Sequence, residues 1–346
     1  LPVTFLDDVG TEVPPPATPP EGLTCTLYSY QLSAIAFMVA REQQNTSTIS
    51  GGILADEQGI GKTIMCAGCV AAHRWTPPAG HDPSFSLSAL RHPCGATLIA
   101  CTSTILQQWR NELAQHAPKL DTLVYGGQSE MSHASVQRDV RRLAQADVIL
   151  VTYEVLTSEL RGLEQSYESN RERRERIGLR ARSSDREDRP SPLKYLDFWR
   201  VILDEVQKAP ASYKAGRTVR MLSAKHRWAC SGTPMADGKL EDVGHLINFI
   251  AGDDRSPAEL QWWREVRSFR AGDTGAVARL QAALRPYFLR RTQAGVAHLI
   301  SIPPQSVRRY TFELSMQERA LQREFVLPAA LRYMAKGRAA AEEPAE

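Results

Sequence analysis

The sequence predicts an α/β protein in which a parallel sheet is flanked by helices, and three observations support this fold class. Short apolar runs, such as those over 96–101 and 201–203, have the length and composition of fully buried strands. Segments with a helical spacing of apolar residues alternate with these runs along the chain. A loop with two glycines also follows one predicted strand and opens a predicted helix, an arrangement typical of α/β proteins that bind phosphate.

The predicted elements follow one another in a regular order. Helices are expected over residues 30–42, 62–74, 104–116 and 134–145, and strands over 51–55, 96–101, 120–125, 147–151 and 201–203. After residue 240 the apolar spacing is helical, which predicts helices over 240–250, 257–269 and 274–284. We therefore expect one α/β domain over 25–250 and a helical protrusion over 251–292.

Two stretches lack the apolar residues that a packed element needs. Residues 1–24 are rich in proline, which predicts an extended linker. Residues 161–190 mix arginine with glutamate and offer almost nothing apolar to bury, which predicts a disordered or weakly helical insertion in the α/β domain. The alternative for this insertion is a nucleic-acid-binding arm, although its opposite charges nearly cancel.

The composition narrows the class of protein. The 346 residues are 42% hydrophobic, which is enough for a buried core, and the net charge of +3 is too small to indicate nucleic-acid binding by itself. No apolar run reaches the roughly 18 residues of a transmembrane helix, so we expect no membrane partner. The chain begins with Leu1 and has no signal-peptide pattern, so we expect an excised piece of a longer protein.

The cysteines are too sparse for a disulfide scaffold. Six are scattered along the chain, at positions 25, 66, 69, 94, 101 and 230, a usage that suits a reducing compartment. Cys66 and Cys69 form a C-x-x-C pair with His73 downstream, which leaves a zinc or redox site as one alternative. Because the pair lies in an apolar helical run, we favour small buried side chains.

The strongest local motif is a phosphate-binding loop. It reads Asp56-Glu57-Gln58-Gly59-Ile60-Gly61-Lys62-Thr63 and lies between a predicted strand and a predicted helix. Gly59 and Gly61 permit close approach of the backbone to phosphate, and amides at the helix start point toward the phosphate oxygens. Lys62 is expected to contact the β- and γ-phosphates of ATP, and the Thr63 hydroxyl to bind Mg²⁺.

A second motif supplies the acidic half of the same site. The apolar strand over 201–203 ends in Asp204 and Glu205. Asp204 is expected to bind Mg²⁺ directly or through water, and Glu205 to orient and polarise the attacking water. The alternative is a strand that ends in two solvated acids, which is common in isolation but less so downstream of a phosphate loop.

Together these motifs resemble the nucleotide site of the SNF2 family of superfamily 2 ATPases, in which an acidic pair normally precedes the glycines of the loop. The resemblance covers residues 25–325 and implies a RecA-like first lobe, with a helical extension, that binds ATP and Mg²⁺. Gln31 resembles the glutamine with which this family reads adenine, because an amide offers one donor and one acceptor to the base. A solvent-facing position on a helix is the alternative for Gln31.

Further segments fall in the order that this family predicts. Residues 98–109 and 151–153 resemble motifs that contact the DNA backbone, which implies phosphate contacts for Thr102, Ser103, Thr152 and Tyr153. Trp109, at the end of the first segment, is favoured as a core anchor. A Ser-Gly-Thr-Pro segment resembles the motif that couples nucleotide state to the DNA side, which implies a coupling role for Ser231, Gly232 and Thr233. Residues 293–346 are interpreted as a bridge toward the second lobe of the family.

One departure from the family affects the acidic motif. The Asp-Glu-Ala-His box of the family reads Asp204-Glu205-Val206-Gln207 here, and a Gln207 in this catalytic position can hydrogen-bond but cannot carry a charge. With the aromatic pair before the strand and the charged insertion, this resembles the Rad5/Rad16 or SHPRH-like branch. That resemblance implies DNA repair and, through a RING finger outside these residues, ubiquitin machinery.

A second departure is the lack of any second-lobe motif after Arg291 in this sequence. The family carries its arginine finger in that lobe, so we expect these residues alone to be nearly inactive. The leading expectation is the ATP-binding lobe of a nuclear ATPase that acts on duplex DNA or nucleosomes once joined to its second lobe. One alternative is a truncated lobe that docks on DNA, chromatin or a partner without turnover. Another is a superfamily 2 enzyme acting on RNA, which the helical extension disfavours.

Overall fold

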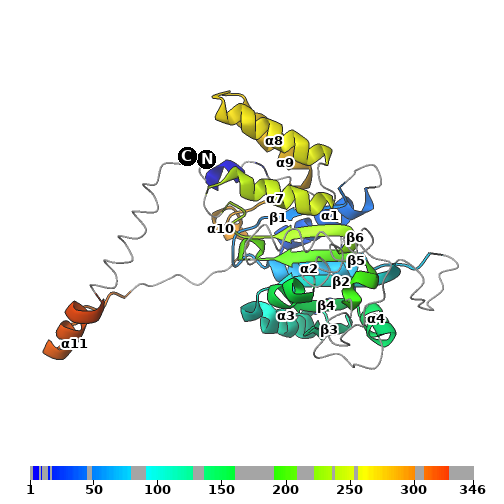
Figure 1. Cartoon of the computed structure of the whole chain (residues 1–346), viewed down its shortest axis with the longest axis horizontal. Coiled ribbons are helices and arrows are strands. Elements are labelled where there is room, and N and C mark those ends of the chain that lie inside the picture. The colour runs from blue at the N-terminus through cyan, green and yellow to red at the C-terminus, as the bar shows by residue number, and fades with distance from the viewer. Residues whose placement is uncertain are drawn as a thin grey trace, which may run out of the picture. The chain divides into compact units, whose positions relative to one another are not determined.

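Seven parallel strands form one sheet in the part of the chain that this computed structural model describes (Figure 1). The described residues are 3–7, 9, 15, 18–44, 49–78, 91–127, 136–159, 191–208, 222–235, 238–252, 256–300 and 308–326. The strands are β1 (Gly51–Leu54), β2 (His92–Cys101), β3 (Thr122–Tyr125), β4 (Val148–Thr152), β5 (Leu196–Asp204), β6 (Ser223–Cys230) and β7 (Phe288–Leu289). Their order, β3-β4-β2-β5-β6-β1-β7, confirms the predicted parallel α/β fold class.

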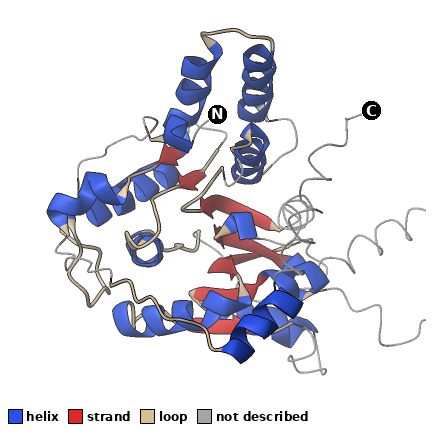
Figure 2. Ribbon diagram, turned by 90° about the vertical axis from the view of Figure 1, so that its left-hand side faces the viewer, coloured by secondary structure: helices blue, strands red, loops and turns tan. Residues whose placement is uncertain are grey.

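Helices cover both faces of this sheet (Figure 2). Successive residues of a strand point to opposite faces, so Ile53 packs with one set of helices and Leu54 with the other. The face of Leu54 is covered by α1 (Ser29–Gln43), α2 (Lys62–Ala72) and α3 (Ser103–His116). The face of Ile53 is covered by α4 (Val136–Gln145) and α7 (Leu240–Ala251). The predicted alternation of strands and helices is therefore confirmed.

The helical protrusion is shorter than predicted. Helices α8 (Pro257–Arg270) and α9 (Ala276–Leu284) pack against each other, and a 3-10 turn over Arg285–Tyr287 then leads back to the sheet. There Phe288 and Leu289 of β7 pair with Ile53 and Leu54 of β1. The expected extent of 251–292 is thus wrong at its C-terminal end, because two apolar residues return to the sheet and complete its edge.

The strand β6 was not predicted, although it lies in the middle of the sheet between β5 and β1. Its sequence, SAKHRWAC, is polar where a central strand is usually apolar. His226 and Arg227 are nevertheless buried, because Ser50 hydrogen-bonds the His226 ring and the carbonyl of Leu222 accepts from Arg227. Partners from other segments therefore satisfy the polar groups of this strand.

The first residues do not form the extended linker expected over 1–24. Residues Val3–Leu6 form a 3-10 turn, and Phe5, Leu6 and Val9 are buried in the core that α7, α8 and α9 share. The side chain of Gln281 donates a 2.9 Å hydrogen bond to the carbonyl of Phe5. Three apolar residues are enough to anchor this segment, so the prediction is wrong for its first part.

The chain divides into two compact units, and the first contains the whole sheet. Residues Leu1–Ser301 form the first unit, which includes α10 (Gln293–Val296) and a 3-10 turn over Ala297–Leu299. Residues Ile302–Glu346 form the second, with α11 (Met316–Leu321) and a π-helical turn over Gln322–Val326. The expected bridge over 293–346 therefore begins later than predicted. The insertion over 161–190 lies outside the described residues. Within those residues, no helix is long and apolar enough to span a membrane.

Candidate nucleotide-binding site

The predicted site residues follow five different strands at the same edge of the sheet. The phosphate loop follows β1, and the acidic pair lies at the end of β5. The segments expected to contact DNA follow β2 and β4, and the Ser-Gly-Thr segment follows β6. Because all strands are parallel, their carboxyl ends meet at one edge, which is where α/β sheets bind ligands.

The phosphate loop is held in shape by its glycines and by Lys62. Gly59 and Gly61 have φ angles of 82° and 93°, in the left-handed region that favours glycine. A Cβ on Gly61 would also lie 2.6 Å from the Nε2 atom of Gln31. The Nζ atom of Lys62 donates to the carbonyls of Asp56 at 2.8 Å and Glu57 at 3.2 Å. The loop backbone therefore holds the ammonium group of Lys62, which is the charge that a phosphate would contact.

Gln31 lies against the loop, which excludes the solvent-facing alternative because its side chain is buried. Its Oε1 atom accepts from the amide of Tyr28 at 3.0 Å, and its Nε2 atom donates to the carbonyl of Ile60 at 3.2 Å. An amide has two donor hydrogens and two acceptor lone pairs, so one of each remains for a base. Beside it, the rings of Tyr28 and Tyr30 stack with centroids 5.6 Å apart.

Asp204 is fixed by two aromatic residues from neighbouring segments. The indole nitrogen of Trp109 donates to its Oδ2 atom at 2.7 Å, and the Tyr153 hydroxyl donates to its carbonyl at 2.8 Å. Burial raises the pKa of Asp204, and the bond from Trp109 and the charge of Lys62 partly offset that rise. Trp109 is buried, as expected of a core anchor, but its N–H also orients the carboxylate.

Glu205 has a backbone conformation that is unusual for a residue with a side chain. Its φ is 49°, the one positive value outside glycine among the described residues. The side-chain amide of Gln207 donates to the Glu205 carboxylate at 2.5 Å, and the hydroxyl of Ser231 donates to the side-chain oxygen of Gln207 at 2.6 Å. Gln207, itself uncharged, thus links the acidic motif to the Ser-Gly-Thr segment through two hydrogen bonds.

The Ser-Gly-Thr segment contacts the phosphate loop closely. The amide of Ser231 donates to the carbonyl of Leu54 at 3.1 Å, and the amide of Thr233 donates to the Ser231 hydroxyl at 3.1 Å. A Cβ on Gly232 would lie 2.9 Å from the side chain of Gln58. A larger residue at this position would force Gln58 to shift, so the two segments are closely packed here.

Comparison with known proteins gives this geometry a family. The SNF2-related domain family matches residues 30–344. The chain belongs to this family. The DNA repair protein RAD5A of Arabidopsis thaliana is 29% identical over 312 residues, which cover 78% of this chain and 27% of the relative. The DNA repair protein rad5 of Aspergillus fumigatus is 30% identical over 291 residues, which cover 78% and 22%.

The expected branch of the SNF2 family is the Rad5/Rad16 or SHPRH-like one, and these relatives support its Rad5 side; the chain spans about a quarter of their length. Among solved structures, the SWI2/SNF2 ATPase core of Sulfolobus solfataricus in complex with dsDNA matches with a TM-score of 0.55 at 22% identity. The match covers 82% of this chain and 48% of that one. This likeness confirms the RecA-like fold.

Three of the four residues expected to contact DNA lie where helices begin at the carboxyl edge of this SNF2 sheet. Thr102 precedes α3 and shares a 2.9 Å hydrogen bond with the Thr104 hydroxyl, and Ser103, the first residue of α3, is exposed. Thr152 accepts from the amide of Val155 at 3.3 Å. The side chain of Tyr153 is buried, so its expected DNA contact rests on the backbone at the start of the helix and stays a prediction.

Two arginines that follow β7, which are not among the predicted site residues, lie against the phosphate loop. Arg291 pairs with the fully buried carboxylate of Asp56. Arg290 donates to the carbonyls of Ala55 at 2.8 Å and Gly232 at 3.3 Å, and pairs with Asp7 at 2.6 Å. The only signal in the sequence is their position directly after the apolar pair of β7.

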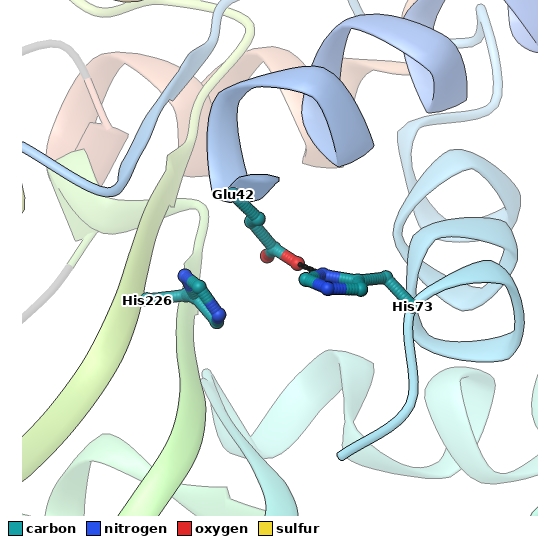
Figure 3. Close-up of side chains that lie close together, drawn as sticks. All are labelled: Glu42, His73 and His226. Carbon is teal, nitrogen blue, oxygen red and sulfur yellow. Dashed lines mark hydrogen bonds and ion pairs between the residues drawn. The ribbon is translucent and has the colours of Figure 1, made fainter. Parts of the chain in front are cut away.

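A buried cluster of charged and polar groups was also missed. Glu42 of α1, His73 at the end of α2 and His226 of β6 point toward one another, with ligand atoms within 4.8 Å (Figure 3). Arg200 donates to both carboxylate oxygens of Glu42 at 2.5 Å, and the indole of Trp228 donates to one of them at 2.8 Å. Burial would raise the pKa of Glu42, but Arg200 lowers it below its usual range.

This cluster does not have the charge of a metal site. The single carboxylate is already neutralised by a guanidinium that has no exposed surface, so the charge of a divalent cation bound here would be left uncompensated. Cys69, one residue of the C-x-x-C pair, contacts the same carboxylate. Burial and the charge of Glu42 raise the pKa of its thiol, which disfavours a thiolate ligand. The zinc alternative is therefore replaced by a buried ion-pair network.

Proposed function

We propose that this chain is the ATP-binding lobe of a DNA-dependent ATPase that acts on duplex DNA or chromatin in the nucleus. One observation carries the proposal: the phosphate loop, the acidic pair and the Ser-Gly-Thr segment lie at one sheet edge and are joined by hydrogen bonds and close packing. Gln207 connects Glu205 with Ser231, and Gly232 lies against Gln58 of the loop. An arrangement in which every part contacts the next fits a site that hydrolyses a nucleotide and transmits its state.

The residues of the loop fit ATP. The glycine backbone and the amides at the start of α2 would bind the phosphates, with Lys62 as the counter-charge. Gln31 and the exposed ring of Tyr28 lie beside the loop, where they would contact adenine through the amide and by stacking. Contacts with neighbouring segments would hold the loop in place, and they are made by four further loop residues, Asp56, Glu57, Gln58 and Ile60.

The residues near Lys62 also fit Mg²⁺. Thr63 lies in the first turn of α2, and burial raises the pKa of Asp204 while the charge of Lys62 partly offsets that rise. These two oxygen donors would hold the ion, which neutralises charge on the transferred phosphate. Trp109 would keep the Asp204 carboxylate oriented toward it, as partners of metal ligands do.

Glu205 is the proposed general base. Its strained backbone and its hydrogen bond from Gln207 fix the carboxylate at the sheet edge, where it would orient the attacking water. Because Gln207 bonds to both groups, a shift of this carboxylate would move Ser231, and Ser231 would in turn move Gly232 and Thr233. This supports hydrolysis over the alternative of a non-hydrolysing docking module.

We propose further that residues 1–346 hydrolyse ATP slowly by themselves. Stabilising the transferred phosphate requires an arginine worth about 10³–10⁵ in rate. Arg290 and Arg291, the nearest candidates, are occupied by Asp7, Asp56 and two backbone carbonyls. The finger would come from a second RecA-like lobe, which would also complete the grip on duplex DNA. Nucleosomes and ubiquitin machinery remain partners of the longer protein in this proposal.

Nucleotide binding tests the proposal directly. Lys62→Ala should weaken the binding of a fluorescent ATP analogue about tenfold or more, because it removes a charge-assisted phosphate contact. Glu205→Gln should bind as the parent does but lose single-turnover hydrolysis. Lys119→Ala, an exposed lysine before the amino end of β3, is the matched control. Equal affinity in Lys62→Ala and Lys119→Ala would disprove the assignment.

A further inference from the structure

The chain segment that leaves the sheet after β7 wraps around the phosphate loop. The amide of Arg291 donates to the Oδ1 atom of Asp56 at 2.9 Å, and its Nε atom donates to the same oxygen at 3.2 Å. A second guanidinium nitrogen pairs with the Oδ2 atom. This is a bidentate pair, supported by a backbone bond, between the first residue of the loop and the end of the sheet.

The next two loop residues bind the same segment. The amide of Glu57 donates to the carbonyl of Arg291 at 3.0 Å, and the amide of Gln293 donates to the Glu57 carboxylate at 2.6 Å. The side chain of Gln293 donates to the carbonyl of Gln58 at 2.8 Å. Three consecutive residues of the loop are therefore each bonded to Arg291 or Gln293.

Arg291 also reaches the adenine side of the site. Its guanidinium lies over the ring of Tyr30, 5.3 Å from the centroid, and it donates to the carbonyl of the same residue. The hydroxyl of Tyr30 in turn donates to the carbonyl of Ile60 at 3.0 Å. One side chain thus connects the start of the phosphate loop with the helix that carries Gln31.

The sheet alone holds this segment weakly. The strand before it, β7, contributes only two paired residues at the edge of the sheet. Asp56 is fully buried, and burial raises its pKa while Arg291 lowers it, so separating the two would leave a buried charge without its partner. The segment and the loop therefore hold each other in place.

We propose that Arg291 is a positioning residue for the phosphate loop, and that residues 290–293 form a strap whose placement is energetically linked to nucleotide binding. The inference rests on the proposed function of the loop. A nucleotide that favours one arrangement of the loop must favour the same arrangement of the strap, because linkage between two sites is reciprocal. Within the first unit, the strap leads directly into α10 and the 3-10 turn over Ala297–Leu299. Nucleotide state is thus communicated to the chain that leaves the lobe.

Hydrogen exchange of residues 1–346 tests the linkage without a mutation. Saturating ADP with Mg²⁺ should slow amide exchange at Glu57, Arg291 and Gln293, whose amides form the bonds between loop and strap. Peptides from α8 should be unaffected and serve as the internal control. Protection of the loop peptide without protection of the strap peptide would overturn the inference.

Variants separate this inference from the proposed function. Arg291→Gln should weaken ADP binding about tenfold, since it deletes a bidentate charged contact, and Arg291→Lys should retain part of the affinity because it keeps the charge. Asp56→Asn combined with Arg291→Gln should weaken binding no more than either change alone, because both remove one interaction. A merely structural arginine would lower the melting temperature without this non-additive change in affinity.

The control is Arg264→Gln, an exposed arginine on α8 whose ion pair is with the neighbouring Glu265. Lys62→Ala serves in the same assay as the test of the nucleotide site. Weaker binding in Lys62→Ala together with parental binding in Arg291→Gln would overturn the strap alone. Parental binding in Lys62→Ala would remove the nucleotide site, and the strap with it.

Discussion

The indole nitrogen of Trp109 lies 2.7 Å from a carboxylate oxygen of Asp204, and this hydrogen bond joins α3 to the end of β5. Both residues are buried, so the bond is shielded from water. Trp109 lies at the end of the segment that is expected to contact DNA, and it orients Asp204, the proposed ligand of Mg²⁺. A shift of α3 on DNA contact would therefore change the position of Asp204 through the side chain of Trp109.

Trp109→Phe should raise the Mg²⁺ concentration needed for half-maximal ATP binding about tenfold. The phenyl ring fills most of the space but cannot donate to Asp204, and loss of a partner to a metal ligand typically weakens metal binding tenfold or more. The measurement is nucleotide affinity across a Mg²⁺ series. Trp262→Phe is the matched control, because it removes an indole bond to the Leu240 carbonyl far from the site. A similar Mg²⁺ dependence in both variants would contradict the role of Trp109.

Gln207→Ala should leave ATP affinity within about twofold of the parent and slow single-turnover hydrolysis about tenfold to a hundredfold, which is less than the roughly 10²–10⁴-fold contribution of a general base because Gln207 only positions Glu205. The change removes the bridge between Glu205 and Ser231 but no predicted phosphate contact. Rapid-quench measurement of hydrolysis tests this. Gln108→Ala, an exposed glutamine on α3, should hydrolyse ATP as the parent does. Loss of affinity in Gln207→Ala would instead indicate a role in binding.

Glu42→Gln should reduce the free energy of unfolding by about 3–5 kcal/mol, because it leaves the fully buried guanidinium of Arg200 without a counter-charge. Urea denaturation gives the free energy. The control is Glu241→Gln, which breaks an exposed pair with Arg270 and should cost no more than about 1 kcal/mol. Equal losses in the two variants would show that the buried pair does not stabilise the core.

The stability of the chain should fall as the pH falls below 6.5, partly through His226. Burial lowers the pKa of this ring from 6.5 to about 3, so between these values the unfolded chain binds a proton that the folded chain does not. The loss is about 1.4 kcal/mol per pH unit for such a group. Glu42, whose pKa is lowered from 4.5, adds its own loss only at lower pH.

His226→Asn should therefore flatten the dependence of unfolding free energy on pH between 6.5 and 5. The asparagine can keep the hydrogen bond with Ser50 that the ring makes at 2.7 Å, but it does not titrate. The exposed His298→Asn should retain the slope of the parent. Identical slopes in the two variants would assign the acid sensitivity to other groups.

The sequence was informative where one segment contains its own signal. The strands β1, β2, β4 and β5 were predicted because they are apolar runs, and the phosphate loop because its glycines and Lys62 are adjacent. β6 was missed because its polar residues are satisfied by Ser50 and Leu222, which no pattern within the strand reveals. Burial of Phe5 and Leu6 was hidden by the prolines that follow them.

The site was predictable in its motifs but not in its connections. Asp56, Asp204 and Glu205 were identified from local sequence, whereas the partners of Asp56 and Asp204 lie elsewhere in the chain. Arg291 is 235 positions from Asp56, and Trp109 is 95 positions from Asp204. Such pairings depend on the order of strands in the sheet, which helical and strand periodicity do not specify. The role of a hydroxyl group such as that of Tyr153 is equally hard to predict from sequence, because it depends on whether the side chain is buried.

The strand order has a consequence for how the protein is made. Among the seven described strands, β1, which carries the phosphate loop, is synthesised first, but its neighbours β6 and β7 are the last two of the seven. During synthesis β3, β4, β2 and β5 can pair while β1 still lacks both partners. Non-local pairing of this kind is slow to form. The bonds between the phosphate loop and residues 291–293 can therefore form only after β7 has been synthesised, so a chain released before residue 288 would have most of the described sheet but would lack these supports of the proposed ATP site.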